Sequence, residues 1–420
     1  MSALVVISVL LLIQVSYSTY LMLFTWNEAD KRDRYRAPAD FAPPEKSFTV
    51  LLPARHEEEV IQGTIQCVLD ANYPRELMEI AVICRIDDLG TIAKVQEKIA
   101  ELVQRGLTNV RLIVFQDFPI NKPHSLNIGL RNTQNEVVTI FDSEDDIHPE
   151  VFNVINTVMV REGVRVVQSG VQLMNYDSQW FSALNVLEYF FWFKSRLHYH
   201  SEIGIIPLGG NTIFFTRRLL NLIGGWDEQC LTEDADIGIR LSEMGERVRV
   251  VYEDAYVTKE ETPPSVGQFI KQRTRWNQGF LQVLRKGDWA KLPKLSQRLL
   301  ALYTLSSPIF QTLTALYLPV SIYTMFFVKM APLVAMILWL PFYMLIGQYI
   351  LNVVGLYEFA AAHGIKLSKT MWLKLLASFY PFQVLLGISA LRAVGREIKG
   401  VNTWEKTKHV NAHRRAAAGN

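Results

Sequence analysis

Two zones of the chain are almost continuously apolar, and the stretch between them alternates apolar and mixed segments. The first zone, residues 3–24, contains no charged side chain and is long enough to cross a bilayer as a helix. The second zone extends from about residue 299 to 391. Within it the hydropathy predicts crossing segments near 306–328 and 331–355, and a weaker one near 371–391.

The charges flanking these zones predict the orientation of the chain. Four cations follow the first zone, Lys31, Arg32, Arg34 and Arg36, and such a cluster is expected on the cytoplasmic side. A cleaved signal peptide is the alternative; the sequence has no basic start and no small-residue cleavage site to favour it. If all three later segments crossed, the basic tail would lie outside. We therefore expect one of them to be interfacial or re-entrant.

These patterns divide the chain into five expected parts. They are an N-terminal transmembrane helix (1–26), a cytoplasmic linker (27–46), a cytosolic domain (47–295), transmembrane or interfacial helices (296–392) and a basic cytoplasmic tail (393–420).

The region from residue 47 to about 260 alternates predicted strands and helices. The expected strands are 47–54, 78–88, 110–115 and 136–146, and the expected helices are 57–71, 91–106 and 122–133. This alternation predicts an α/β domain with a parallel sheet. Ligands of such sheets bind beyond the carboxyl ends of the strands, and two of these strands end in acidic residues. We therefore expect the acids to face one crevice.

The strongest acidic cluster follows the fourth predicted strand, in the sequence FDSEDD. Asp142, Glu144, Asp145 and Asp146 repel one another unless a cation lies among them. Carboxylate oxygens suit Mg²⁺ or Mn²⁺, which are commonly shared with substrate phosphates. A solvated acidic turn is the alternative interpretation of this cluster.

Two further strand ends carry residues suited to a nucleotide. Asp87 and Asp88 follow the second strand, where a carboxylate can accept a hydrogen bond from a base N–H or a ribose hydroxyl. In PARHEEE, after the first strand, Arg55 suits a phosphate and Glu57 suits a ribose. Acids favoured at a helix N-terminus by the helix dipole are the competing explanation for at least one of these glutamates.

A later acidic segment, LTEDADIGIRL, places Glu233, Asp234 and Asp236 directly after Thr232. Thr232 is a good N-cap residue, so simple capping is a serious alternative to catalysis. Capping leaves unexplained why the segment follows the glycine-rich stretches PLGGNTIFF and GGWDE. Those stretches are typical of a wall that approaches a ligand closely.

Composition narrows the possible functions. The 420 residues carry a formal net charge of +2, which favours neither a nucleic-acid binder nor a protein that binds acidic substrates. The three cysteines are far apart and include no CxxC spacing, so neither a disulfide framework nor a zinc site is expected.

Together these motifs resemble the processive-type inverting glycosyltransferases of family 2, which include cellulose, hyaluronan and chitin synthases. The resemblance covers nearly the whole chain and rests on the order of its motifs, PARHEE, IDD, NKPHSLNIGL, FDSEDD, GGNTIFF with GGWDE, TED and QRTRW. The tail WEKTKH is also similar to the cytoplasmic end of such proteins. The resemblance implies a GT-A (Rossmann-like) domain, inserted between transmembrane helices, that binds a nucleotide-activated sugar.

The resemblance also implies roles for individual residues. Asp234, with Glu233 beside it, corresponds to the catalytic base, and Asp142 with Glu144 to the pair that holds metal and diphosphate. Lys122 lies near the nucleotide. The resemblance also implies that the nucleotide sugar is bound by Arg55, Glu57 and either Asp87 or Asp88. It implies that the acceptor or the diphosphate is bound by Asn211, Gln272, Arg275 and Trp276.

Two departures from the family pattern leave alternatives open. The metal motif reads Asp-Ser-Glu, so the second ligand is either Glu144 or Asp145. The IDDLGT segment lacks the usual serine-rich continuation, which leaves the nucleobase undecided.

The QRTRW segment suits a sugar site at the membrane surface. Arg275 is a rigid donor for a leaving diphosphate, and Trp276 offers a flat face on which a sugar ring stacks. Gln272 suits a hydrogen bond to phosphate or sugar. The alternative is an interfacial anchor of aromatic and cationic residues.

The expected function is that of a metal-dependent inverting hexosyltransferase in the cell (inner) membrane, with Mg²⁺ or Mn²⁺ as cofactor. It would extend a polysaccharide, with accessory secretion subunits as further partners, or make a single addition to a lipid. UDP-glucose is the first expected donor; UDP-N-acetylglucosamine, UDP-galactose and GDP-mannose stay open. A transporter with a sensor domain is a third interpretation, disfavoured because the apolar segments hold few charges, chiefly Lys374.

Overall fold

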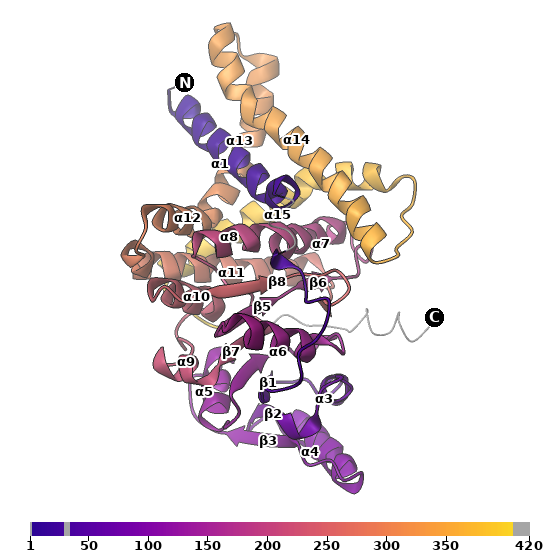
Figure 1. The fold of residues 1–420 in the computed structure, drawn as a ribbon. Coiled ribbons are helices and arrows are strands. Elements are labelled where there is room, and N and C mark those ends of the chain that lie inside the picture. Colours follow the sequence, from indigo (N-terminus) through magenta and orange to yellow (C-terminus); the bar gives the residue numbers. More distant parts are fainter. Residues whose placement is uncertain (1, 29–33, 406–420) are drawn as a thin grey trace.

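A computed structural model of the chain describes residues 2–28 and 34–405. The predictions that rest on Lys31, Arg32 and the tail beyond Glu405 lie outside these residues. The chain forms an α/β domain from which three long helices project on one side (Figure 1). These helices come from opposite ends of the sequence, so the domain lies between them along the chain.

The centre of the domain is a seven-stranded sheet in the order β3-β2-β1-β4-β7-β5-β8. All its neighbouring strands pair in parallel except β7, which runs antiparallel to β4 and β5. The strands are β1 Phe48–Ala54, β2 Met78–Arg85, β3 Val110–Phe115, β4 Val137–Ile140, β5 Val166–Ser169, β7 Ile213–Thr216 and β8 Val248–Val251. The parallel arrangement predicted for the first four strands is confirmed.

A small second sheet pairs β6 (Val171–Leu173) with β9 (Thr258–Glu260) in parallel.

The strand ends differ from the sequence prediction in one useful respect. The acidic residues expected to end the second and fourth strands stand in the loops that follow them. β4 stops at Ile140, opposite Leu51, while β1 continues to Ala54. The residues after Ile140 therefore leave the ladder and turn toward the edge where parallel strands present their ligands.

Helices cover both faces of the large sheet. One face packs against α3 (Ile61–Leu69), α4 (Leu89–Gln104) and α6 (Val151–Glu162). The other face packs against α5 Lys122–Arg131, α8 Leu197–Ile203, α9 Arg217–Leu222 and α10 Glu233–Glu243. The helix predicted over 57–71 is shorter than expected, because its three leading glutamates form a turn before α3.

A layer of long helices lies between the sheet domain and the projecting helices. It contains α7 Ser182–Phe191, the π-helix η2 Trp192–Arg196 and α11 Val266–Lys286, followed by η3 Asp288–Lys291 and α12 Leu295–Leu305. A short 3₁₀ helix, η1 Arg75–Leu77, precedes β2.

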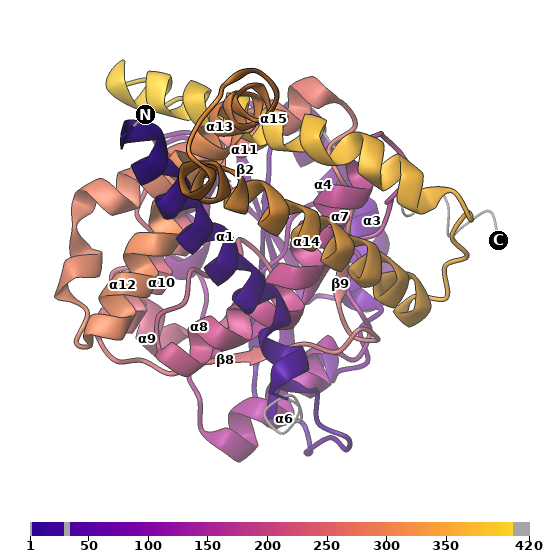
Figure 2. The same cartoon turned by 90° about the horizontal axis from the view of Figure 1, so that it is seen from above.

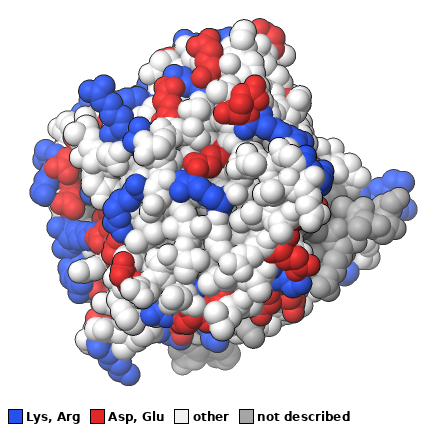
Figure 3. Space-filling model, turned by 90° about the horizontal axis from the view of Figure 1, so that it is seen from below, with Lys and Arg blue, Asp and Glu red and all other residues white. Residues whose placement is uncertain are grey.

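Within residues 2–28 and 34–405, four helices are long and apolar enough to cross a membrane. They are α1 Ser2–Asn27, α13 Ser307–Phe327, α14 Pro332–Ala362 and α15 Met371–Ile398. α1, α13 and α14 project from the domain, whereas α15 lies flat across its top in both views (Figures 1 and 2). On the opposite face, cations and acids are interspersed, without a field of one sign (Figure 3).

α15 rests on α11 along much of its length. Phe382 packs on Phe269 of α11, the Thr274 hydroxyl donates to the Ser389 carbonyl, and Glu397 pairs with Arg285 at 2.6 Å. The middle and the C-terminal end of this helix are therefore held against α11, unlike a helix that crosses away from the domain.

Candidate active site

One cavity of about 580 Å³ opens at the carboxyl ends of β1 and β4 and continues between α1, α13, α14 and α15. This is the edge at which the sequence placed the ligand. The expected site residues that line it are Arg55, Glu57, Lys122, Asp142, Glu144, Asn211, Glu233, Asp234, Gln272, Arg275 and Trp276. Segments more than two hundred residues apart in the chain therefore meet in one space.

The loop after β4 is built around a buried carboxylate. Asp145 is fully buried and accepts hydrogen bonds from both the Asp142 backbone N–H, at 2.8 Å, and the Asn211 side-chain amide, at 2.8 and 2.9 Å. Burial, and then the charge of Glu260, raise the pKa of Asp145 well above its usual range. Asp145 thus holds the loop in shape, while Asp142 and Glu144 line the cavity.

This arrangement changes the expected role of Asn211. The sequence placed its side chain on the acceptor or diphosphate. In the structure the side-chain amide is engaged by Asp145 and also donates to Glu260. Asn211 lines the cavity, but its amide group supports the acidic loop.

Asp142 and Glu144 form an open donor set of hard oxygens. Among residues 2–28 and 34–405, no group of three or more His, Cys, Asp and Glu side chains forms a closed metal site. Mg²⁺ and Mn²⁺ commonly take one or two carboxylates and complete their coordination with substrate phosphates and water. Two cavity-facing carboxylates therefore fit such an ion.

Lys122 connects this loop with the glycine-rich wall. It begins α5, where the Asn121 side chain caps the helix, and its ammonium lies 2.5 Å from Asp142 and 3.1 Å from the Gly210 carbonyl. Burial disfavours the charged ammonium, but the carboxylates of Asp142 and Glu233 outweigh it and raise the pKa of Lys122. The cation is therefore retained at the floor of the cavity.

Two carboxylates from the start of α10 face this cation. Burial and the negative charge of Asp234 raise the pKa of Glu233 to about 7, although Lys122 and Arg275 oppose the shift. Burial also raises the pKa of Asp234, against the opposing effect of a hydrogen bond from its own helix backbone. Raised carboxylate pKa values make these groups better bases near neutral pH.

Thr232 occupies the N-cap position of α10, as predicted, but its side chain makes no capping hydrogen bond. It packs instead on the backbone of Gly279 in α11. A Cβ at Gly279 would lie 2.3 Å from the Thr232 hydroxyl oxygen. The alternative that this side chain caps the helix therefore does not hold, because close contact between two helices takes up the Thr232 side chain, although the three acids do lie in the first turn of α10.

Arg275 reaches the cavity from α11. Burial lowers its pKa, although the acidic groups Glu233, Asp142, Asp234 and Glu144 act against that effect. Its guanidinium lies 4.3 Å from the ring of Trp404, and its Nε atom is buried with no hydrogen-bond partner among the described residues. A buried donor beside a carboxylate and cation cluster suits a diphosphate oxygen.

Trp276 lines the cavity next to Arg275, and its ring is fixed by Arg273. The Arg273 guanidinium lies 4.6 Å from the Trp276 ring and is held by Glu188, at 2.5 Å, and by Asn185 of α7. Tyr189 adds a tilted ring contact at 6.3 Å. The second residue of QRTRW thus positions the tryptophan, although the sequence gave it no role.

Asp88, one of the two candidates for nucleotide contact, is a structural residue here. It is buried, and its carboxylate accepts from the His56 backbone N–H at 2.7 Å and from the Thr91 backbone N–H at 3.4 Å. His56 has a positive φ of 55°. Asp88 therefore fixes the turn that presents Arg55 and Glu57 to the cavity.

Asp87 lies on the surface beside the cavity. It pairs with Arg85 at 2.5 Å and approaches Arg55 at 3.8 Å, and both arginines line the cavity. Neither Asp87 nor Asp88 is among the described residues that line it.

The two glycine-rich stretches behave differently. Residues 207–211 line the cavity, as expected. Residues 224–228 do not, because this stretch packs against α5 and α10. Gly225, with φ of 74°, leaves space for the Asn127 side-chain oxygen, which a Cβ would approach to 2.4 Å. The GGWDE part of the expected binding wall is thus a support.

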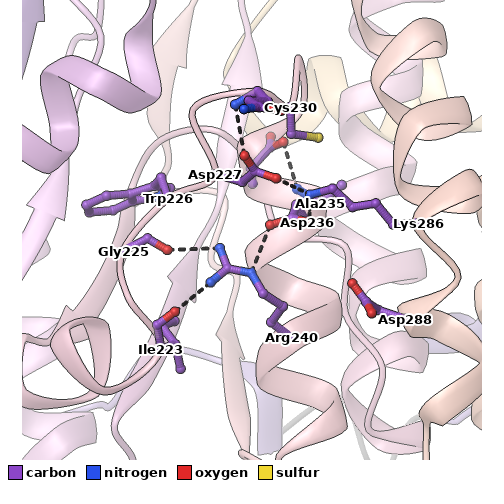
Figure 4. A network of polar contacts seen from close by, with 12 residues as sticks. Ile223, Gly225, Trp226, Asp227, Cys230, Ala235, Asp236, Arg240, Lys286 and Asp288 are labelled. Atoms are coloured by element: carbon purple, nitrogen blue, oxygen red, sulfur yellow. Dashed lines mark hydrogen bonds and ion pairs between the residues drawn. The ribbon is translucent and has the colours of Figure 1, made fainter. Parts of the chain in front are cut away.

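An ion network around the buried carboxylate of Asp236 fastens this support to the helices that carry the site (Figure 4). Asp236 of α10 pairs with Arg240 at 2.8 Å and with Lys286 of α11 at 2.5 Å. Arg240 donates to the Ile223 and Gly225 carbonyls, and Lys286 also pairs with Asp227. The acid Asp236, grouped with Glu233 and Asp234 in the sequence, therefore points away from the cavity.

Sequence reasoning missed the site contributions of Arg273 and Trp404. Trp404 lines the cavity because Glu405 pairs with Arg392 of α15 at 2.6 Å and so holds the end of the described chain against that helix. The family-like tail was a sequence signal for Trp404. No sequence signal indicated the role of Arg273, because its partners on α7, Asn185 and Glu188, lie more than eighty residues earlier in the chain.

Comparisons with known proteins agree on the class of domain. A family model described as "Glycosyltransferase like family 2" matches residues 43–279. Curated relatives include a probable glycosyltransferase, YdaM, of Bacillus subtilis, 25% identical over 57% of this chain and 56% of the relative. They also include a beta-monoglucosyldiacylglycerol synthase of Nostoc sp., 26% identical over 56% of this chain and 49% of the relative.

A poly-beta-1,6-N-acetyl-D-glucosamine synthase of Staphylococcus epidermidis is 25% identical over 65% of this chain and 63% of the relative. The chain thus spans about half to somewhat under two thirds of the length of these relatives. Among solved structures, the mannosyltransferase PcManGT of Pyrobaculum calidifontis, in complex with GDP-Man and Mn²⁺, superposes with a TM-score of 0.55. It is 19% identical, and the match covers 93% of this chain and 99% of that one, which shows a shared fold.

Proposed function

The chain belongs to glycosyltransferase family 2, and on this basis we propose that it moves a hexose from a nucleotide-diphosphate donor to a growing polysaccharide. Membership of the family and the GT-A fold, both expected from the motifs, are confirmed. The observation that carries the proposal is a single cavity that joins a carboxylate and cation cluster to the apolar helices.

The donor would bind at the sheet end of the cavity. Arg55 and Glu57 are presented there by the turn that Asp88 holds, and Lys122 supplies a permanent positive charge. Arg275 offers a buried, unpaired Nε for the diphosphate. Asp142 and Glu144 would hold Mg²⁺ or Mn²⁺, which when bound neutralises charge on the leaving diphosphate. UDP-glucose is the first donor to test.

The proposed reaction is a single displacement with inversion. Asp234 takes the proton from an acceptor hydroxyl as that oxygen bonds to the anomeric carbon. The bond from this carbon to the diphosphate oxygen breaks, and its electron pair leaves with the nucleotide. Lys122 and Arg275 stabilise the charge that develops there, in a site where burial strengthens electrostatic effects. Glu233 adds a second base within the same cluster.

The membrane arrangement follows from how the helices meet the domain. We place α1, α13 and α14 across the bilayer and α15 along its surface, because α15 is fastened to α11 from its middle to its C-terminal end. Three crossings bring residue 362 back to the domain, where Lys194 pairs with Glu358 of α14 at 3.0 Å. With this placement the catalytic domain and the end of the described chain would both lie on the cytoplasmic side, as the flanking cations predict.

The acceptor would occupy the part of the cavity between the helices. Uncharged amides line it there, Gln14 of α1, Gln311 of α13, Gln348 and Asn352 of α14, and Gln383 of α15. Amides both donate and accept, which suits sugar hydroxyls, and polar side chains at membrane depth mark functional sites. The alternative is a single addition to a lipid, which the synthase of Nostoc sp. among the relatives brings into consideration.

Product size tests the proposal. The full chain, reconstituted in lipid with Mg²⁺, is incubated with a panel of labelled nucleotide sugars, and the products are separated on a sizing gel. We expect a high-mass, glycosidase-sensitive smear from one donor. A single low-mass, lipid-soluble product would replace the polymer with the glycolipid alternative.

The catalytic assignment has its own test. Asp234→Asn should abolish transfer while nucleotide binding persists, because it removes the base without altering the diphosphate contacts. Asp177→Asn, on an exposed turn, is the matched control and should transfer at the wild-type rate. Turnover retained in the Asp234 variant would exclude it as the base.

A further inference from the structure

A second cationic position lies in the same cavity, beside α1. Arg196 ends the π-helix η2, which packs directly beneath α1. π-helices are rare, and the inserted residue turns side chains away from the regular helical face, frequently at functional sites. Here Arg196 lines the cavity together with residues of α1 and α12, and α12 and α8 lie below α1 in Figure 1.

The surroundings of Arg196 form a set of hydrogen-bond donors from three elements. Its guanidinium donates to the Ser18 hydroxyl of α1 at 2.9 Å. The hydroxyl of Tyr303, on α12, lies within hydrogen-bond reach of the Ser18 and Gln14 side chains. All four residues line the cavity. A guanidinium has five N–H donors, and in the described part of the chain the bond to Ser18 is the one that Arg196 makes.

The charge of Arg196 is only partly compensated. Burial lowers the pKa of its guanidinium, and the groups that oppose this effect are Tyr303 and Glu188. Glu188 is itself paired with Arg273 at 2.5 Å. A cation removed from water, with one hydroxyl partner and a shared carboxylate, favours an anionic ligand.

Arg196 and Arg275 reach the cavity from different elements. Arg196 ends η2 and donates to Ser18 of α1, whereas Arg275 lies on α11 with its guanidinium 4.3 Å from the Trp404 ring. The catalytic carboxylates act on Arg275, and the other arginine lies beside α1.

We propose that Arg196, Ser18 and Tyr303 bind the phosphate group of a membrane lipid. The planar guanidinium matches two phosphate oxygens, and the two hydroxyls donate to the remaining ones. Val15, Leu21 and Met22 of α1 line the same cavity and provide an apolar wall for an acyl or prenyl chain. The inference rests on the proposed membrane placement of α1, and it adds a lipid site to the proposed transferase.

The experiment compares two lipids with the same chains. The full-length protein in a neutral detergent is titrated with dioleoyl phosphatidic acid or dioleoylglycerol, and binding is counted by native mass spectrometry. We expect wild type to bind the phosphate lipid at least about tenfold more tightly, since charge-assisted hydrogen bonds distinguish the two. Arg196→Gln should lose this preference, and Arg196→Lys should keep part of it.

Controls separate the site from general effects of charge and folding. Arg218→Gln removes an exposed arginine of α9 and should keep the full preference. Ser18→Ala tests the same site from α1 and should reduce the preference several-fold, whether or not the Arg196 variants fold well. Equal binding of the two lipids by wild type, or an unchanged preference in Arg196→Gln, would overturn the proposal.

Inorganic phosphate is the third ligand in the titration. If it competes with phosphatidic acid at equal concentration, the site takes free phosphate, and the lipid assignment is wrong. The proposed function is measured separately, as sugar transfer from labelled donors. If wild type transfers sugar but binds both lipids equally, only this site is refuted. If wild type prefers the phosphate lipid but transfers sugar from no donor, only the proposed function is refuted.

Discussion

Gly279 is the position where a single methyl group should disturb catalysis most selectively. It lies in α11, one turn after Trp276, and its backbone touches Thr232 at the start of α10. Gly279→Ala places a Cβ 2.3 Å from the hydroxyl oxygen, 2.5 Å from Cγ2 and 2.7 Å from Cβ of Thr232. The next residues along α10 are the two carboxylates of the proposed site.

The size of the effect follows from these distances. Carbon atoms in contact prefer about 3.5 to 4.0 Å, so Thr232 must retreat by about 1 Å. Alanine gains about 1 kcal/mol over glycine in a helix, and overpacking costs about 1 to 3 kcal/mol. The net change in unfolding free energy is therefore a loss of about 2 kcal/mol or less. A shift of about 1 Å in a catalytic group costs on the order of 100-fold in turnover.

The assay measures the rate of nucleotide release and the thermal unfolding midpoint on the same purified samples. We expect kcat of Gly279→Ala to fall about 100-fold while the midpoint drops by only a few degrees. Gly267→Ala is the matched control in the same helix, because its Cβ would meet only the Ser265 hydroxyl, at 4.0 Å. It should retain wild-type turnover and be at least as stable.

A Gly279 variant with wild-type kcat and KM would refute this reasoning. It would mean that the Thr232 side chain can shift without displacing the carboxylates of Glu233 and Asp234. The contact between α10 and α11 would then not position the site. A variant that loses stability and activity in equal measure, with little folded protein, would equally contradict the predicted selectivity.

Four further predictions concern the site and the helix that carries its carboxylates. The pKa of Glu233 is raised to about 7 in the folded protein, so its contribution to stability is present below the unfolded value near 4.5 and is lost as pH rises through 7. At a pH above 7, Glu233→Gln should therefore have a higher thermal unfolding midpoint than wild type. Near pH 4 the two midpoints should be equal. In wild type, kcat/KM should fall as pH drops below about 7, because the Glu233 and Asp234 carboxylates take up protons, and a limb near pH 4 instead would contradict their raised pKa values. Excess chelator should stop transfer, and Mg²⁺ or Mn²⁺ should restore it; full activity in chelator would exclude a metal at Asp142 and Glu144. Gly238→Ala should lower the free energy of unfolding by about 3 kcal/mol, since its Cβ would lie 2.1 Å from the Ile206 backbone carbonyl, and a midpoint equal to that of wild type would contradict this close packing.

Local patterns were sufficient for much of the fold. The period of the apolar residues located the four parallel strands and their helices, because burial on both faces of a sheet leaves a continuous apolar run. The lengths of the nearly uncharged apolar runs located the four helices that are long enough to cross a membrane. Element ends were less certain: β4 stops at Ile140, several residues before the predicted end, since the strand loses its partner there.

Within an acidic cluster, the sequence could not assign separate tasks. Asp145 and Asp142 are close in the chain and chemically alike, yet one is buried as an anchor and the other faces the cavity. Asp88 likewise holds a turn, while its neighbour Asp87 lies on the surface. The choice depends on which backbone N–H groups and amides surround each carboxylate, and those groups come from distant segments.

The sequence by itself determined the family, the α/β alternation, the apolar helices and most of the charged residues at the sheet end of the cavity. These are properties of residue type and local spacing, which need no knowledge of how distant segments meet. Only the tertiary structure decided that α15 lies on α11, that Arg273 fixes Trp276, and that Arg196 lines the cavity beside Ser18 of α1. Those relations are contacts across more than eighty residues of chain, or distances within a shared cavity, and packing in three dimensions alone sets them.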